Sequence, residues 1–228
     1  MTIRKLAVLA SLIAVTACSS EKTTEVTISK FLRGIAKAKI TKVIPKKTGA
    51  PKAGQVLNRQ MIDDSKSEIL LAKIDKPGVV NILQKTAQNG TRKTYRSPAG
   101  FSITLDQGLI TATRGLGYDL MAQATDISVK NMFSNRTNKD PYKRRFRYLN
   151  TDNKLETTLF ICLMSYQGQE TINIVGKNYT TGKYSEKCQS ETTHFENQYW
   201  VDRNRVTIWK STQRIHPVLG TITTQKLN

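Results

Sequence analysis

Residues that often carry catalysis or bind metals are scarce in this sequence, which has two histidines and three cysteines among 228 residues. Neither His194 nor His216 lies near a Gly-x-Ser-x-Gly nucleophile motif, and so few thiols and imidazoles make a poor zinc set. The carboxylates are scattered, for example at Asp106, Asp119, Glu156 and Glu196. The sequence therefore predicts no enzyme, cofactor or metal site, with a glycosidase-like carboxylate pair as the alternative.

The sequence also lacks an apolar run long enough to cross a bilayer, which takes ~20 residues. Its longest run, Leu6 to Thr16, follows Arg4 and Lys5, as in a secretory signal. The run ends in Val15-Thr16-Ala17-Cys18, which resembles a bacterial lipobox, whose cysteine is acylated and becomes the first mature residue. We therefore predict a signal peptide over 1–17, a lipid on Cys18 and a tether over 18–27. The alternative is a soluble secreted protein with an incidental cysteine.

Acidic residues are few: 17 Asp and Glu stand against 36 Lys and Arg, a formal charge of +19. Such a charge favours anionic partners, and an envelope location argues against nucleic acid. Ser19, where aspartate would favour the inner membrane, indicates a periplasm-facing protein on the outer membrane. The expected partners are acidic polysaccharide, lipid head groups or acidic protein surfaces. A host whose proteins are generally basic is the alternative explanation of the charge.

An amphipathic helix is predicted from Ile28 to about Lys39, because apolar residues recur at helical spacing while lysines and an arginine lie outside that face. The helix either packs on its own domain or lies along anionic head groups. Once Cys18 carries lipid, Cys162 and Cys188 have only each other as thiol partners. We predict a disulfide between them, with two separately buried thiols as the alternative.

Short strands separated by turn residues are predicted beyond Pro51, which indicates one mainly β, antiparallel domain over 28–228. A short central helix is expected over Tyr118 to Ala124, after a turn at Gly115-Leu116-Gly117. The predicted strands are 67–74, 78–84, 101–105, 109–113, 144–150, 156–165, 169–177, 194–201, 205–213 and 220–227.

The segment around residue 145 is the best candidate for a polyanion contact, because it interleaves rings with cations. In a strand, Arg145 and Arg147 share one face while Arg144 and Phe146 share the other. The alternative is a solvated edge strand, since charges protect sheet edges. The candidate residues are Tyr142, Lys143, Arg144, Arg145 and Arg147. Trp200 and Trp209 are interpreted as core residues, with sugar stacking as the alternative.

Two segments carry a family resemblance: Arg114-Gly-Leu-Gly-Tyr-Asp-Leu-Met121, and Tyr199-Trp-Val-Asp202 followed by Ile208-Trp-Lys-Ser211. Together with the lipobox, they are similar to the YjbF/GfcB lipoproteins of group 4 capsule and exopolysaccharide gene clusters. The resemblance runs from about Lys30 to the C-terminus. It implies a barrel-like domain of coiled sheets that acts in capsule or exopolysaccharide assembly or export, with no catalytic residues to transfer.

The sequence thus favours a lipid-anchored, non-enzymatic periplasmic accessory protein. A glycan-modifying enzyme with a carboxylate pair and a general binder of anionic envelope components remain open as alternatives.

The first testable prediction concerns Cys18. A Cys18→Ser substitution should leave the precursor without lipid and mislocalised, because serine lacks the thiol that accepts the acyl chain. Metabolic labelling with palmitate measures this, and a Ser19→Ala variant is the matched control. Equal label in wild type and Cys18→Ser would overturn the assignment.

Overall fold

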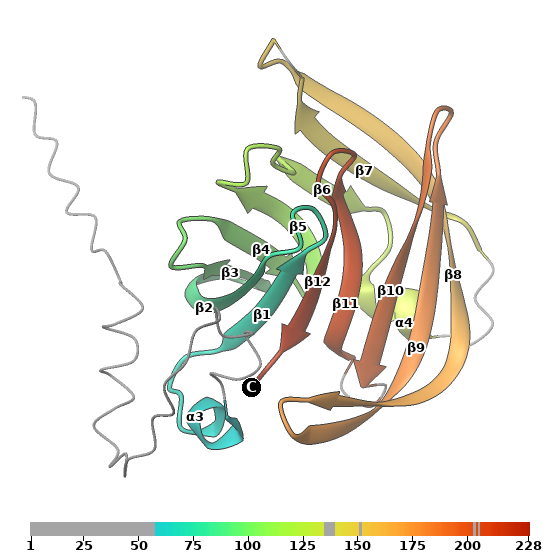
Figure 1. Cartoon of the computed structure of the whole chain (residues 1–228). Coiled ribbons are helices and arrows are strands. Elements are labelled where there is room, and N and C mark those ends of the chain that lie inside the picture. Colours follow the sequence, from blue (N-terminus) through green and yellow to red (C-terminus); the bar gives the residue numbers. More distant parts are fainter. Residues whose placement is uncertain (1–57, 135–139, 151, 203, 205) are drawn as a thin grey trace, which may run out of the picture.

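Twelve strands pair into one antiparallel sheet in the order β5-β4-β3-β2-β1-β12-β11-β10-β9-β8-β7-β6 (Figure 1). This computed structural model describes residues 58–134, 140–150, 152–202, 204 and 206–228. The strands are β1 (Ile69–Ile74), β2 (Val80–Asn89), β3 (Arg92–Arg96), β4 (Ser102–Asp106), β5 (Leu109–Arg114), β6 (Ala122–Thr125), β7 (Tyr142–Leu149), β8 (Leu155–Ile174), β9 (Lys177–Gln189), β10 (His194–Asp202), β11 (Thr207–His216) and β12 (Gly220–Lys226). The two described helices are α3 (Arg59–Asp63) and α4 (Val129–Ser134).

The sheet curls until its two outer strands meet, which gives a nearly closed barrel. At the seam, the Thr113 amide of β5 donates to the Leu120 carbonyl just before β6, at 2.9 Å. The Arg114 guanidinium donates to the carbonyls of Leu120 and Met121, both at 3.1 Å. Closure matters because an open sheet edge exposes unpaired backbone groups. The expected mainly β, barrel-like fold is confirmed.

Tight turns set the registers of the short hairpins. Asn89 pairs with Arg92, so Gly90 and Thr91 form a two-residue loop, with Gly90 at positive φ. Gln107 and Gly108 both have positive φ between β4 and β5. A Cβ on Gly108 would lie 2.8 Å from Ile208, so only glycine allows this turn to approach β11. The turn signals in the sequence therefore mark real hairpins.

Two apolar clusters stabilise the fold. The larger one fills the barrel interior and includes Leu83, Ile103, Phe146 and Phe160. The smaller one joins Ile62 of α3, Trp200 of β10 and the tip of the β8–β9 hairpin, which contributes Ile172 and Ile174. Figure 1 shows this tip curling beneath the barrel toward α3. The core role expected for Trp200 is confirmed, since it is buried, and Trp209 packs partly buried against the same cluster.

Some sequence expectations were wrong in detail. The segment predicted as a helix is a loop over residues 118–121 followed by the start of β6, and the short central helix is α4 instead. The reason is the carboxylate of Asp119, which accepts hydrogen bonds from Thr113 Oγ1 and from the amides of Gly115 and Leu116, and so closes a turn. The strands predicted over 156–165 and 169–177 are one strand, β8, with an irregularity near Gly168.

Two further regions differ from expectation or fall outside the structure. The strand β9 was not predicted, because its sequence is largely polar. The predicted signal peptide, tether and amphipathic helix lie outside the described residues, so those domain boundaries stay predictions. Neither helix of the described part is long and apolar enough to cross a membrane.

The predicted disulfide is present. Cys162 of β8 and Cys188 of β9 are opposite partners in the ladder and are covalently bonded. Both lie in the barrel interior. The bond closes a loop with a sequence separation of 26 residues and so ties the two longest strands together.

The second prediction concerns this bond. Replacing both Cys162 and Cys188 by alanine should lower the free energy of unfolding by about 3 kcal/mol, the entropy of closing a loop of this size in the unfolded chain. Urea denaturation measures the loss, and the reduced wild type should lose a similar amount. Two alkylatable thiols in the unfolded, unreduced wild type would contradict the bond.

Candidate functional site

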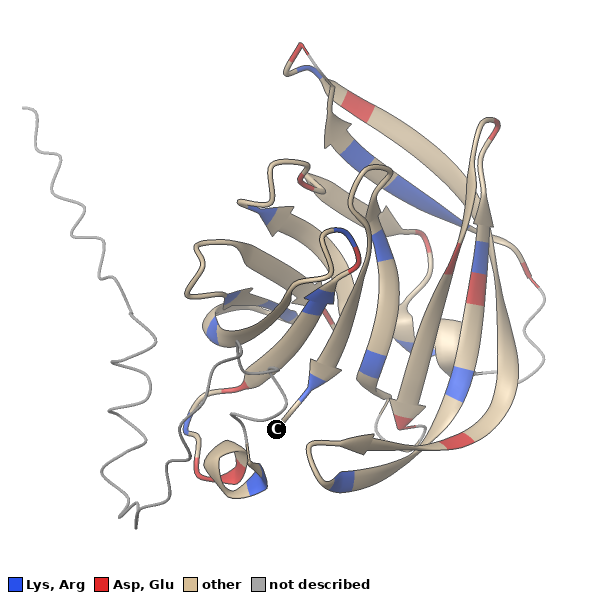
Figure 2. Cartoon of the chain, viewed as in Figure 1, with Lys and Arg blue, Asp and Glu red and all other residues tan. Residues whose placement is uncertain are grey.

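Strand β7 divides the five candidate polyanion residues between two faces. Tyr142 and Arg144 point into the barrel and are buried, whereas Lys143, Arg145 and Arg147 are exposed. Figure 2 shows the resulting run of basic residues along β7. The alternation expected for Arg144 against Arg145 and Arg147 is therefore observed.

Inside the barrel, Arg144 forms a buried ion pair with Glu186 of β9. Its Nη1 lies 2.6 Å from Glu186 Oε2, and the two side chains are 1% and 0% exposed. Three further groups donate to the same carboxylate: the Tyr142 hydroxyl, the Tyr199 hydroxyl at 2.7 Å and Asn197 Nδ2 at 2.7 Å. A buried charge is tolerated only when it is paired and hydrogen-bonded, as this one is.

The electrostatics of this network favour a structural role. Burial is the main cause that raises the pKa of the Tyr142 and Tyr199 hydroxyls, and the neighbouring Glu186 raises it further. Both hydroxyls therefore remain protonated and can act as donors. Because this carboxylate of β9 accepts from donors on β7 and β10, it holds the three strands together.

The prediction that Tyr142 and Arg144 contact a polyanion was wrong, because a partner at the surface cannot reach side chains that the barrel interior encloses. Glu186 was missed altogether. One signal could have found it: on a strand, Tyr184, Glu186 and Cys188 share a face, and a disulfide-bonded Cys188 in the core places the other two inside.

The exposed part of the candidate site continues onto β8. Leu159, Ile161 and Leu163 point outward and are 46%, 46% and 47% exposed. The ladder places Lys143 opposite Ile161 and Arg145 opposite Leu159, and on the other side Lys187 of β9 opposite Leu163. We call this surface the β7–β8 face: the cations Lys143, Arg145, Arg147 and Lys187 and the aliphatic side chains Leu159, Ile161 and Leu163.

The charges of the β7–β8 face are free to act on a partner. Among the described residues, none of its four cations has a carboxylate within ion-pair distance. Successive outward residues on a strand are about 7 Å apart, so β7 presents a regular row of positive charge. An open groove of about 1450 Å³ begins at the aliphatic side chains and extends past His194 to Arg214.

The scattered carboxylates each have a local partner. Asp106 pairs with Arg92 at 3.4 Å, and Asp119 closes the turn before β6. Glu156 accepts from Asn150, and Glu196 accepts from Ser185. They lie on β4, the β5–β6 loop, β8 and β10, and the hydrogen bonds do not link any one of them to another.

This architecture places the chain in a class of large antiparallel barrels whose basic residues lie mainly on the surface. The sequence matches the family described as group 4 capsule polysaccharide lipoproteins, gfcB and YjbF, over residues 30–227. The chain therefore belongs to this family, as the sequence resemblance indicated.

The fold is also found in a solved structure. The crystal structure of the hypothetical lipoprotein YmcC from Escherichia coli (K12) matches with a TM-score of 0.68 and 14% identity. The match covers 79% of this chain and 98% of YmcC. A search of curated proteins found no match. At this identity the likeness establishes the fold alone.

The third prediction tests the buried pair. Arg144→Met should lower the free energy of unfolding by about 3–5 kcal/mol, because it leaves Glu186 buried with an uncompensated charge. Arg145→Met, one residue away but exposed, should change it by less than about 0.5 kcal/mol. Adding Glu186→Gln to Arg144→Met should recover part of the loss. Urea denaturation compares the variants, and equal losses for the two arginine variants would contradict the assigned role.

Proposed function

We propose that this protein is a lipid-anchored, non-enzymatic accessory of capsule or exopolysaccharide assembly or export, and that it binds acidic polysaccharide through the β7–β8 face. The observation that carries the proposal is the row Lys143, Arg145 and Arg147 on the outside of a barrel from a capsule polysaccharide lipoprotein family. Cys18 provides the lipid anchor, and the barrel faces the periplasm from the outer membrane.

The chemistry of the face suits an acidic sugar chain. Guanidinium groups pair with carboxylates through two parallel N–H donors, which lysine cannot do. The aliphatic side chains beside them offer a surface on which the C–H faces of sugar rings lose contact with water. Because β7 and β8 are neighbours in the sheet, the row of cations lies beside the row of aliphatic side chains. An extended polymer could therefore contact both rows along its length.

The affinity of each contact is expected to be small. Exposed ion pairs contribute ~0.2–1 kcal/mol each, so binding depends on many sugar units at once. Salt should abolish it, since the Debye length falls to about 3 Å at 1 M. The buried Glu186, fully engaged by four donors, is not presented to such a chain, which supports a binding role over a catalytic one.

The fourth prediction tests this surface. Replacing Lys143, Arg145 and Arg147 by serine should weaken retention on immobilised alginate, a polyuronate, by roughly 3- to 100-fold at low salt. This range is what the loss of three exposed ion pairs with the polymer predicts. The matched control replaces Lys66, Lys73 and Arg96, which are also exposed but lie elsewhere in the fold.

The outcomes separate the alternatives. Equal losses from both triple variants would mean general charge attraction and would reject the β7–β8 face as a site. No retention of the wild type at low salt would reject the polymer. Binding to anionic lipid vesicles but not to alginate would favour a membrane-surface role instead.

A further inference from the structure

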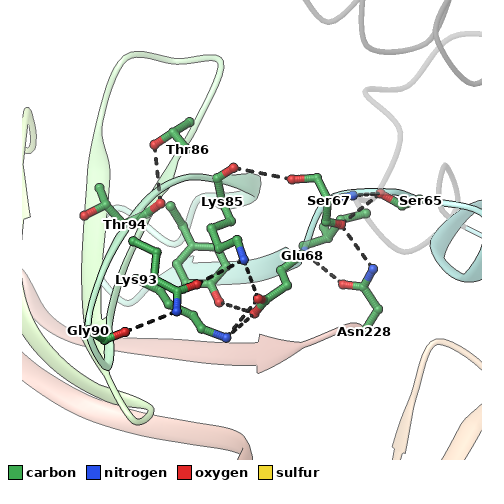
Figure 3. A network of polar contacts seen from close by, with 12 residues as sticks. Ser65, Ser67, Glu68, Lys85, Thr86, Gly90, Lys93, Thr94 and Asn228 are labelled. Atoms are coloured by element: carbon green, nitrogen blue, oxygen red, sulfur yellow. Dashed lines mark hydrogen bonds and ion pairs between the residues drawn. The ribbon is translucent and has the colours of Figure 1, made fainter.

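A second group of cations lies at one end of the barrel, beside the start of β1. Lys85 Nζ lies 2.7 Å from Glu68 Oε1, and Lys93 Nζ lies 2.8 and 2.9 Å from the two carboxylate oxygens (Figure 3). The Tyr95 hydroxyl also donates to Glu68, at 3.0 Å. Burial alone would raise the pKa of Glu68, but these hydrogen bonds outweigh it and lower the pKa to about 2.

The cluster carries more positive than negative charge. Lys226 of β12 lines the same pocket as Lys93 and Glu68, and Glu68 is the only acidic residue among the described residues that line it. Among the residues that the structure describes, none has a carboxylate within ion-pair distance of Lys226. Burial lowers the pKa of Lys226, and the charges of Lys93 and Lys85 lower it further although Glu68 acts in the opposite direction. Two lysines thus pair with one carboxylate, while a third lies in the same pocket without one among the described residues.

The pocket has the size and lining of a small-molecule site. Its volume is about 390 Å³, within the range of about 300–1,000 Å³ for ligand pockets. Leu70, Leu105 and Ile208 are buried and supply apolar walls. The more exposed part of the lining carries amide and hydroxyl groups, namely Gln88, Thr91, Gln107 and Thr207.

We propose that this barrel-end pocket binds one small sugar that bears a carboxylate or a phosphate, with Lys93 and Lys226 holding the anionic group. An ammonium group has three donors. Lys93 donates to the two oxygens of Glu68 and has a third donor left over, and Lys226 has no carboxylate partner among the described residues. Both lysines can therefore donate to the anionic group of a ligand. The amide and hydroxyl groups bind the sugar hydroxyls, and the apolar walls contact the ring.

This site is separate from the proposed polymer surface. The pocket is lined by β1 to β4, β11 and β12 together with the turns β2–β3, β4–β5 and β10–β11. It shares no residue with the β7–β8 face. It is a compact pocket sized for one small anion, whereas the outer row faces an extended chain. Either site can therefore be present without the other.

The test is calorimetric titration of the purified full-length protein with glucuronate, glucose 6-phosphate and neutral glucose. We expect saturable binding of at least one anionic sugar, and at least fivefold weaker binding of glucose. The two anionic arms distinguish a carboxylate ligand from a phosphate ligand. Two variants change the pocket charge in opposite directions: Lys226→Gln should weaken anion binding at least fivefold, and Glu68→Gln should tighten it because it removes the competing carboxylate.

The controls keep the result specific to this pocket. Lys73→Gln removes the same charge from the outward side of β1, and the serine triple variant of β7 removes the polymer surface. Both should bind the sugar as the wild type does. Circular dichroism checks that each variant is folded. No binding of either anionic sugar, binding of glucose as tight as that of its anions, or an equal loss in Lys73→Gln would each overturn the proposal.

Discussion

The inward position of Arg144 determines what the surface of this barrel can do. Side chains alternate along a strand, so a shift of one residue would exchange its two faces. Because Arg144 is bonded to a carboxylate at the centre of the barrel, β7 has one register, and in that register Lys143, Arg145 and Arg147 must face outward. One buried ion pair thereby fixes a row of free cations on the opposite side of the strand.

Positive charge is handled in three different ways in the described chain. In the interior, Arg144 is matched by one carboxylate and its neutral donors. At the barrel end, Glu68 only partly neutralises the lysines around it. On the β7–β8 face, the four cations have no carboxylate within ion-pair distance among the described residues. Desolvation explains this order, since an unpaired charge costs least in water and most in the interior. The degree of neutralisation therefore falls from Arg144 in the interior, through the barrel end, to the β7–β8 face.

The sequence predicted the parts of the fold that local rules control. Turn residues and alternating apolar residues located most of the hairpins, and thiol counting paired Cys162 with Cys188. Strand β9 was not predicted because it buries the polar residues Thr181, Ser185 and Glu186 beside Tyr184 and Cys188, so its sequence shows no clear hydrophobic alternation. Asp119 lies in the segment predicted as a helix, yet its carboxylate closes a turn instead. Such errors arise where polar side chains, rather than apolar periodicity or local turn residues, determine the local structure.

The candidate sites were harder to predict for a related reason. The basic residues of β7 lie within one short stretch of sequence, so the sequence located them. The prediction wrongly included the inward-facing Tyr142 and Arg144 with the outward-facing cations. The group around Glu68 joins side chains from β2, β3 and the chain before β1, which only the folded sheet brings together. Composition indicates how much charge a chain carries. Pairing of distant strands decides where that charge is neutralised.

The place at which the chain enters the sheet has a mechanical consequence. Strand β1 lies in the middle of the sheet order, hydrogen-bonded to β2 on one side and to β12 on the other. The turn of helix before it is fastened separately, through Ile62 in the smaller apolar cluster and through Arg59, which donates to the Leu227 carbonyl at 2.7 Å. A pull on the N-terminal segment would thus load two ladders in shear, so that many bonds must break together. An attachment at that end can bear force without peeling the barrel open.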